Sequence, residues 1–273
     1  MVDYSDTELG QETRYTDQYD PSLLCSIPRS KARQKSKQGA LPFMGADLWT
    51  AFEISWLNSD GLPQVAIGEF FFPCISDSII ESKSFKLYLN SVIQTQYETK
   101  QALQNVLLKD LSAASGSQVE IVLYELSEYA GFNPISESEG VCVDQQSVVI
   151  DTYQPDASLL NADQQELVTE TLYSHLLKTN CPVTNQPDWA SIYISYQGPR
   201  IDRTGLLKYI VSYRMHQDFH EQCVEQIFAD LMALCQPTEL SVYARYMRRG
   251  GLDINPYRST TFTRPPSMRQ VRQ

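Results

Sequence analysis

The sequence lacks the short motifs that mark the common nucleotide- and metal-binding folds. No Gly-x-Gly-x-x-Gly follows a predicted strand and no Walker loop is present, so a dinucleotide would not bind in the Rossmann manner. None of the six cysteines forms a Cys-x-x-Cys pair, which argues against a zinc ribbon or a thioredoxin-like centre. Histidine is also scarce, with three in 273 residues, and of these only His220 stands out by its position.

Long apolar runs are absent too. No stretch reaches the length of a membrane span, and the first residues lack the basic and then apolar pattern of a signal peptide. We therefore expect a cytoplasmic protein that keeps its thiols reduced and does not bind a membrane. The chain of 273 residues, with 42% hydrophobic residues and 16 tyrosines, can bury a substantial core in one large unit or in two of ordinary size.

Positive charge is scarce and unevenly distributed. The net charge of −11 argues against nucleic-acid binding, and no Lys or Arg occurs between Asp110 and Leu177. Residues 239–273, by contrast, contain seven arginines and only two acids. The last three arginines are typical of a solvated tail, whereas Arg248-Arg249-Gly250-Gly251 predicts a tight turn where arginines could meet an anion.

Strand and helix patterns occur in the same order twice. The first half begins with a hairpin, in which apolar residues alternate over residues 48–56 and return before Pro73. Helical sequence follows, including an amphipathic helix that ends near Gly116, and then a strand over residues 119–123. The second half predicts a strand over residues 192–196, helices near 206–213 and 224–231, and a strand over 240–246 that turns into a last strand from Leu252.

An acidic stretch rich in turn residues separates the two halves. The spacing of apolar residues over 163–178 predicts a helix that leads to Cys181. The repeated order predicts an α+β fold of two like modules, each an antiparallel sheet covered on one face by a helix pair, and we expect a homodimer. The predicted parts are an N-terminal arm (1–44), a first module (45–132), an acidic connector with its helix (133–180) and a second module (181–273).

The stretch of residues 180–189 carries the best candidate for covalent chemistry. Pro182 and Pro187 disfavour helical backbone at the residues before them, so Cys181 is presented from extended chain. Asp188 follows seven residues later, just before a predicted strand. A cysteine held in this way suits a nucleophile and a nearby acid suits a proton donor, although a lone cysteine is more often a small buried side chain.

Other polar residues occur at predicted helix starts. His220 and Glu221 open a helix, where polar ligands and anions bind, although an acid that caps the helix is the simpler explanation. Glu81 precedes a helix in the first module as Glu221 does in the second, and two such acids could hold the N–H edge of a flat heterocycle. His220 and Cys223 are three residues apart and could share a metal, but Cys223 also belongs to the apolar row of its helix, which favours a core thiol.

Four segments occur together in the same order as in a known family. They are Glu-Ser-Lys-Ser-Phe-Lys (81–86), Cys-Pro-Val-Thr-Asn-Gln-Pro-Asp (181–188), Phe-His-Glu (219–221) and Arg-Arg-Gly-Gly-Leu-Asp (248–253). Together they resemble the NADPH-dependent 7-cyano-7-deazaguanine reductases, the nitrile reductases of queuosine biosynthesis, a tRNA modification. The resemblance is to the long, two-module type and covers nearly the whole chain. It implies the tunnelling fold for both modules, NADPH as the cofactor and no metal.

The resemblance also implies a mechanism and a set of site residues. Cys181 would add to the nitrile carbon and form a covalent thioimidate, and Asp188 would supply a proton to the nitrogen, which requires that it hold a proton near neutral pH. One NADPH would take the thioimidate to an imine, and a second would take the imine to the aminomethyl product. The deazapurine substrate would be bound by Ile80, Glu81, Ser82, His220 and Glu221, and NADPH by Ser82, Lys83, Arg249 and Gly250.

Two alternatives stay open at this point. The first is a zinc-dependent cyclohydrolase of the same fold that uses Cys181, His220 and Cys223, and metal analysis would distinguish it. The second is a purine-binding module without activity. The presence of both Cys181 and Asp188 argues against the second, because binding alone requires neither.

Overall fold

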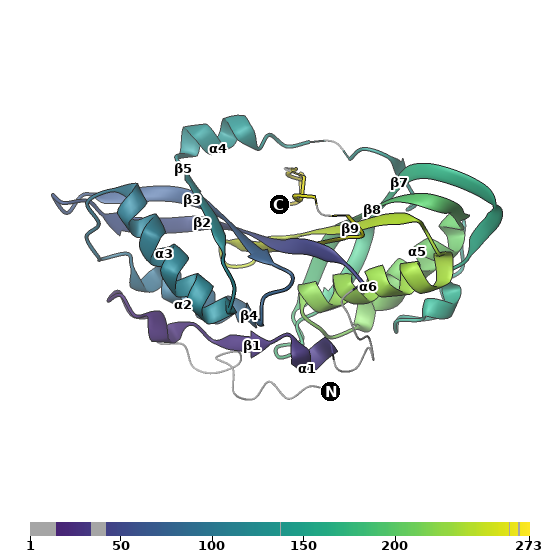
Figure 1. Ribbon diagram of the computed structural model, residues 1–273, viewed down its shortest axis with the longest axis horizontal. Coiled ribbons are helices and arrows are strands. Elements are labelled where there is room, and N and C mark those ends of the chain that lie inside the picture. The colour runs from purple at the N-terminus through teal and green to yellow at the C-terminus, as the bar shows by residue number, and fades with distance from the viewer. Residues whose placement is uncertain (1–14, 34–41, 137, 262, 267) are drawn as a thin grey trace. The chain divides into compact units, whose positions relative to one another are not determined.

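The computed structural model describes residues 15–33, 42–136, 138–261, 263–266 and 268–273. The chain divides into two compact units (Figure 1). The first unit comprises Asp47–Pro134, Arg248–Asp253 and the described part of Met1–Gly39, and the second comprises Ile135–Met247, Ile254–Gln273 and the described part of Ala40–Ala46. Within the described residues, no helix is both long and apolar enough to cross a membrane.

The first unit is a sheet with helices packed on it, and its predicted hairpin is confirmed. Helix α2 (Ser82–Ser91) packs on the sheet through Phe85, whose ring meets the rings of Trp49 and Phe70 edge-on. Helix α3 (Lys100–Ser115) ends at Gly116, which takes the left-handed backbone (φ 69°) that favours glycine. The sheet order is β5-β3-β2, with β2 at Met44–Leu57, β3 at Pro63–Pro73 and β5 at Glu120–Tyr124. The other elements are η1 (Pro21–Leu23), β1 (Ser26–Pro28), α1 (Ser30–Arg33), β4 (Ser78–Ile80), which pairs with β1, and α4 (Leu126–Phe132).

The second unit repeats this plan with longer strands, so the predicted α+β class holds for both. Its sheet has the order β10-β9-β8-β7-β6, and its neighbouring strands are antiparallel except for β6, which runs parallel to β7. Its strands are β6 (Val141–Cys142), β7 (Ala162–Asn180), β8 (Pro187–Ile201), β9 (Glu239–Tyr246) and β10 (Leu252–Ser259). Its helices are η3 (Ala157–Leu159), α5 (Arg203–Ser212), η4 (Tyr213–Met215) and α6 (His220–Cys235).

Each unit contains a similar hydrogen bond between its two long helices. In the first, the Tyr88 hydroxyl of α2 donates to Asp110 of α3 at 2.7 Å. In the second, the Tyr209 hydroxyl of α5 donates to Asp230 of α6 at 2.6 Å. An Asp-x-Ser-Leu-Leu segment precedes each helix pair, and its Asp accepts from the serine amide and hydroxyl; it lies at residues 20–24 and 156–160. The halves thus contain a short sequence repeat, where the sequence pattern alone indicated only a repeated order of elements.

The predicted helix over residues 163–178 is wrong, because this segment forms strand β7. Leu172 and Ser174 alternate into the buried face as a strand requires, but the register with β8 shifts between Ser174 and Leu177, and shifts once more near the start of β7. Such irregularities insert residues into the alternation. The apolar residues of this segment are therefore spaced as in a helix. The segment nevertheless forms a strand, because it pairs with β8.

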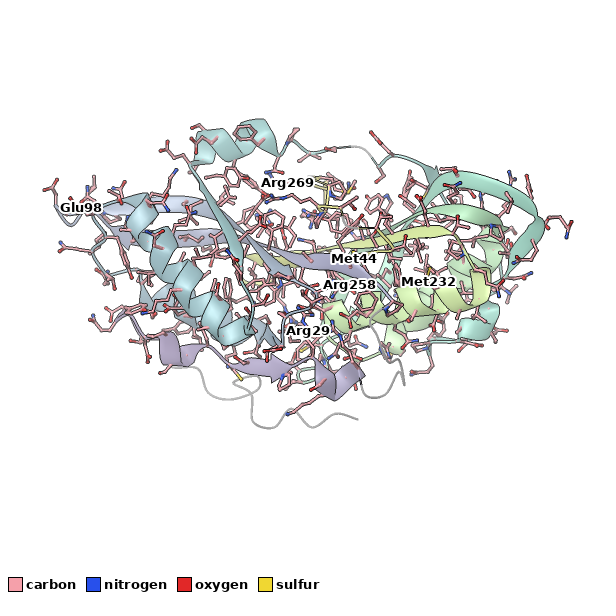
Figure 2. The ribbon with its side chains drawn as sticks, in the orientation of Figure 1. Arg29, Met44, Glu98, Met232, Arg258 and Arg269 are labelled. Atoms are coloured by element: carbon pink, nitrogen blue, oxygen red, sulfur yellow. The ribbon has the colours of Figure 1, made fainter. Side chains whose placement is uncertain are left out.

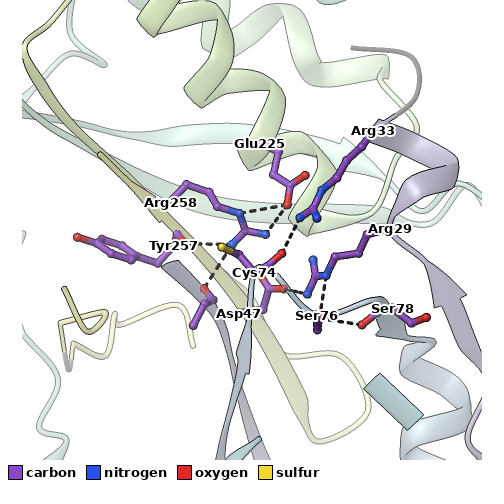
Figure 3. A network of polar contacts seen from close by, with 10 residues as sticks. Arg29, Arg33, Asp47, Cys74, Ser76, Ser78, Glu225, Tyr257 and Arg258 are labelled. Atoms are coloured by element: carbon purple, nitrogen blue, oxygen red, sulfur yellow. Dashed lines mark hydrogen bonds and ion pairs between the residues drawn. The ribbon is translucent and has the colours of Figure 1, made fainter. Parts of the chain in front are cut away.

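A buried arginine, Arg258 of β10, anchors polar contacts within the second unit (Figures 2 and 3). Its side chain is fully buried, and its guanidinium donates to Glu225 of α6 from Nε at 3.1 Å and from Nη2 at 2.8 Å. Two main-chain carbonyls accept from Nη1. In the first unit, Arg29 makes a similar buried pair with Asp47 at 2.6 Å. Each unit therefore contains a buried ion pair formed by residues of that unit.

Arg258→Met is expected to lower the free energy of unfolding by about 3–5 kcal/mol, because it removes the two charged hydrogen bonds that Arg258 donates to the largely buried Glu225 carboxylate. Urea unfolding followed by circular dichroism would measure the change. Adding Glu225→Met should recover part of the loss, since both members of the ion pair are then replaced by apolar side chains. A double variant no more stable than the single one would contradict this account.

Candidate active site

The tip of the β7–β8 hairpin holds Cys181. This residue follows directly after β7 and is 3% exposed. Its amide donates to the carbonyl of Gln186 at 2.9 Å, and its carbonyl accepts from the amide of Asn185 at 3.0 Å. Asn185 has a φ of 56°, a backbone conformation that asparagine adopts more readily than most residues. The thiol therefore sits on a closed loop outside any helix, as the positions of Pro182 and Pro187 predicted.

Asp188 lies within the sheet and not before it. It is the second residue of β8, pairs with Thr179 of β7 and is 7% exposed. The expected place just before a strand is corrected, because β8 begins at Pro187, and proline is accepted as the first residue of a strand. One carboxylate oxygen, Oδ2, lies 3.3 Å from Nε2 of His220. The position of Asp188 in β8 thus directs its carboxylate toward His220, the first residue of α6.

His220 is the first residue of α6, and its ring has a neighbour at each nitrogen and on one face. The ring stacks on that of Tyr246 with 3.6 Å between centroids and 4° between planes. Nδ1 lies 3.3 Å from the carbonyl oxygen of Ile254, and because a carbonyl can only accept, Nδ1 carries a proton. In the neutral ring Nε2 then presents its lone pair to Asp188. A hydrogen bond between Asp188 and His220 therefore requires one proton, held on the carboxyl or on Nε2, and for this requirement the two residues are named the proton-sharing pair.

Glu221 and Cys223 lie in the first turns of α6, and both are buried. Burial raises the pKa of the Cys223 thiol well above its ordinary value, which keeps it protonated and agrees with its interpretation as a core thiol. Among the described residues, no three His, Cys, Asp or Glu side chains are gathered as a metal site. The geometry therefore gives no support to zinc bound by Cys181, His220 and Cys223.

Glu81 caps the N-terminus of α2 in the first unit. It is fully buried, and its two oxygens accept from the amides of Lys83 at 2.6 Å and Ser84 at 2.7 Å. The expectation that Glu81 and Glu221 are matched is wrong, because Asp202 caps the equivalent helix α5 while Glu221 lies in the second helix of its pair. Oε1 also accepts from the hydroxyl of Ser82 at 3.5 Å, whereas Oε2 keeps a second lone pair with which Glu81 can accept from a ligand.

Glu81 gives a pH-dependent prediction. Burial raises its pKa, opposed by the two amide hydrogen bonds and by nearby lysines. A carboxyl whose pKa is raised by folding stabilises in its protonated form, so this contribution is present below the ordinary value of 4.5 and is lost as pH rises through the folded value. We expect the melting temperature of Glu81→Gln to rise relative to wild type between about pH 4 and pH 7, measured by scanning calorimetry. A difference independent of pH would contradict this.

The turn at residues 248–251 lies against α2. It is closed by a hydrogen bond from the amide of Arg249 to the carbonyl of Leu252 at 2.9 Å. Gly250 has a φ of 60°, and a Cβ on it would lie 3.3 Å from Nζ of Lys86. The absence of a side chain at Gly250 therefore leaves room for the lysine beside the turn.

The remaining expected contacts surround the start of α2. Ile80 ends β4, and Ser82 and Lys83 form the first residues of the helix. With Lys86 and Arg249, they place cationic side chains and a hydroxyl in one region of the first unit. This donor set suits phosphate oxygens, so the residues present fit a cofactor that carries phosphates.

Comparison with known proteins identifies the family. The chain matches a family model described as "Nitrile reductase, 7-cyano-7-deazaguanine-reductase N-term" over residues 15–123 and one described as "QueF-like protein" over residues 187–264. It is 51% identical over 268 residues to the NADPH-dependent 7-cyano-7-deazaguanine reductase of Paraburkholderia phymatum, an alignment that covers 97% of each chain. The chain belongs to the 7-cyano-7-deazaguanine reductase family. The crystal structure of the archaeosine synthase QueF-Like in the apo form is a weaker likeness, with 18% identity and a TM-score of 0.31 over 36% of this chain and 96% of that one.

The segments that match the 7-cyano-7-deazaguanine reductase family contain all but one of the expected site residues. The exception is Cys181, which lies just before the second matched segment. Sequence reasoning missed Tyr246 and Ile254, which hold the ring of His220. In the sequence, these two residues belong only to the alternating apolar pattern of a strand. That pattern predicts that a side chain is buried but does not predict which residue it contacts.

Proposed function

We propose that this chain catalyses the NADPH-dependent reduction of the nitrile group of 7-cyano-7-deazaguanine to give 7-aminomethyl-7-deazaguanine, in tRNA queuosine biosynthesis. The observation that carries the proposal is the 51% identity, over 97% of the chain, with a reductase of that name. The geometry of the second unit supports it, because a thiol at the hairpin tip and a proton-sharing pair of acid and imidazole occur in one unit. These are the groups that reduction of a nitrile through a covalent adduct requires.

Cys181 is the proposed nucleophile. Its Sγ adds to the nitrile carbon, a C–S bond forms, and the nitrogen gains a proton to give a covalent thioimidate. NADPH, when bound, would supply the two hydride equivalents that the thioimidate carbon requires, and the C–S bond breaks between the two reductions. The thiolate is both nucleophile and leaving group, so Cys181 is regenerated in every cycle.

Asp188 is the proposed proton donor. Its low exposure limits exchange with bulk water, and its contact with Nε2 of His220 provides a second position for the transferable proton. Once Asp188 has protonated the substrate nitrogen, a proton taken up by the imidazole can return to the carboxylate. The pair can therefore serve both reduction steps.

Substrate and cofactor are assigned to the remaining residues as part of the same proposal. Glu81 and Glu221 are each assigned to the deazapurine substrate, since a carboxylate can accept two parallel N–H groups of a guanine-type edge. Ile80, Ser82 and His220 complete the substrate set. Ser82, Lys83, Arg249 and Gly250 are assigned to NADPH.

The setting of the enzyme is proposed as well. We assign one tunnelling-fold module to each unit. Because β7 pairs with β8 in the second unit's sheet, the second module begins before the predicted residue 181 and includes part of the predicted connector 133–180. Parts of the arm, residues 1–14 and 34–41, lie outside the described residues. The protein is proposed to act as a cytoplasmic homodimer on a free small molecule, without binding nucleic acid or membrane.

Purified protein, 7-cyano-7-deazaguanine and NADPH test the proposal directly. We expect 7-aminomethyl-7-deazaguanine by mass spectrometry, with two molecules of NADPH oxidised for each molecule of product. Substrate binding without NADPH oxidation would instead support the purine-binding module, and turnover of GTP together with stoichiometric zinc would support the cyclohydrolase. Either result, in the absence of the amine product, would defeat the reductase proposal.

A further inference from the structure

We infer that Tyr246 is a positioning residue for the proton-sharing pair: its ring fixes the plane of the His220 imidazole, so that Nδ1 meets Ile254 and Nε2 meets Asp188. This role rests on the proposed function of the pair in proton delivery. Tyr246 is the last residue of β9 and His220 is the first residue of α6, and both belong to the second unit (Figure 1). Tyr246 touches none of the reacting atoms and acts through His220.

The contact between the two rings is specific in its geometry. A centroid distance of 3.6 Å with planes 4° apart is full face-to-face stacking, whereas uncharged aromatic pairs prefer offset or edge-on arrangements. Rotation of the imidazole about its bond to Cβ would break both hydrogen-bonding contacts, and the tyrosine face blocks that rotation.

The main chain of Tyr246 is itself held by side chains. The pairing of β9 with β10 runs from Ser241 only as far as Tyr243, and Pro256 beyond that point has no N–H to donate. Where the ladder is open, the amide of Tyr246 donates to Oδ1 of Asn255 at 3.0 Å. The same opening leaves the carbonyl of Ile254 for Nδ1 of His220. The opening between β9 and β10 thus supplies two of the three contacts of the His220 ring, those with Tyr246 and with the carbonyl of Ile254.

A second side chain, that of Gln273, completes the support of the Tyr246 main chain. Gln273 is buried, and its Nε2 donates to the carbonyl of Tyr246 at 2.9 Å and to Oδ1 of Asn255 at 2.9 Å. Arg245 donates to Oε1 of the same glutamine at 2.8 Å. The tyrosine backbone is therefore fixed at both its amide and its carbonyl, and the ring has little freedom to follow a moving imidazole.

The hydroxyl of Tyr246 does not explain its presence. The group is fully buried near the hydroxyl of Thr179, without a well-formed hydrogen bond to it or to any other described residue. A buried hydroxyl without a partner stabilises nothing. It follows that the ring carries the role and that phenylalanine should replace tyrosine without loss.

The test compares Tyr246→Phe with Tyr246→Leu. We expect the Phe variant to keep kcat within about twofold of wild type and the Leu variant to lose about 100-fold in kcat, with KM for 7-cyano-7-deazaguanine changed far less. Nitrogen-15 histidine NMR should show His220 with Nδ1 protonated in wild type and the Phe variant, and a mixture of tautomers in the Leu variant. Tyr246→Met replaces Leu if that variant does not fold.

Phe228→Leu is the matched control. This ring is fully buried on the same helix as His220 and packs edge-on against Phe43, so its loss should destabilise the unit similarly while leaving kcat near wild type. Equal losses in Tyr246→Leu and Phe228→Leu, or a loss in Tyr246→Phe as large as in Tyr246→Leu, would overturn the inference. If the wild type shows no reductase activity, the proposed function fails, while the NMR tautomer comparison still decides whether Tyr246 positions His220.

Discussion

Cys181→Ala is expected to abolish covalent capture of 7-cyano-7-deazaguanine and to reduce NADPH oxidation to the uncatalysed background. The wild-type protein, incubated with the nitrile and no NADPH, should gain the full mass of the substrate, because addition of a thiol to a nitrile loses no atom. Alanine has no nucleophile, so intact-mass spectrometry should show no adduct. The effect on rate is total because both reduction steps follow from the thioimidate.

The control for this experiment is a second thiol of the same unit. Cys223 is fully buried, and burial raises its pKa, so it is a poor nucleophile near neutral pH. Cys223→Ala should retain the adduct and most of the activity. An adduct that persists in Cys181→Ala but vanishes in Cys223→Ala would contradict our proposal, because it would show that Cys223 is the nucleophile.

Local sequence signals located the nucleophile loop correctly. Proline restricts its own φ and the residue before it, so Pro182 and Pro187 already excluded a helix around Cys181. Gly116 marked the end of α3 in the same local way, because a left-handed C-terminal residue favours glycine. Such features depend on one or two residues and can be predicted from them.

Features that depend on distant pairing could not be predicted. Strand β7 has irregular register with β8, and its apolar residues therefore looked helical. Glu81 is equivalent to Asp202 and not to Glu221, because Glu81 and Asp202 each cap the first helix of a helix pair. This equivalence can be recognised only when the order of helices and strands in each unit is known. The contact of Tyr246 with His220 depends on an opening between β9 and β10 that no apolar pattern records.

The family motif named Asp188 and His220 separately, as proton donor and substrate contact, and the structure joins them. Their atoms are 3.3 Å apart, and the opposite nitrogen of the ring is committed to a carbonyl. In our proposal, His220, which is assigned to substrate binding, is therefore also part of the pair that holds the catalytic proton. This coupling is why a change at either residue should alter the pH dependence of the rate.

Asp188→Asn is expected to lower kcat by a factor of about 100 to 10,000, the usual range for loss of a general acid. The fold should persist, because asparagine has nearly the same shape and its amide can donate to Nε2 of His220. KM should change little, since Asp188 is assigned to proton transfer and not to binding. Steady-state kinetics of NADPH oxidation across neutral pH would measure all three effects.

For this variant, the dependence of the rate on pH distinguishes a role of Asp188 in proton transfer from a role in maintaining the fold. In wild type the rate should fall as pH rises and the proposed acid Asp188 loses its proton, and Asp188→Asn should lack that decline because its amide has no proton to lose. Asp218→Asn is a fair control, since Asp218 also faces a histidine, His216, at 3.8 Å but is more exposed. It should keep the wild-type profile. A flat wild-type profile, or an Asp188→Asn profile that declines in parallel with it, would show that the proton does not come from Asp188.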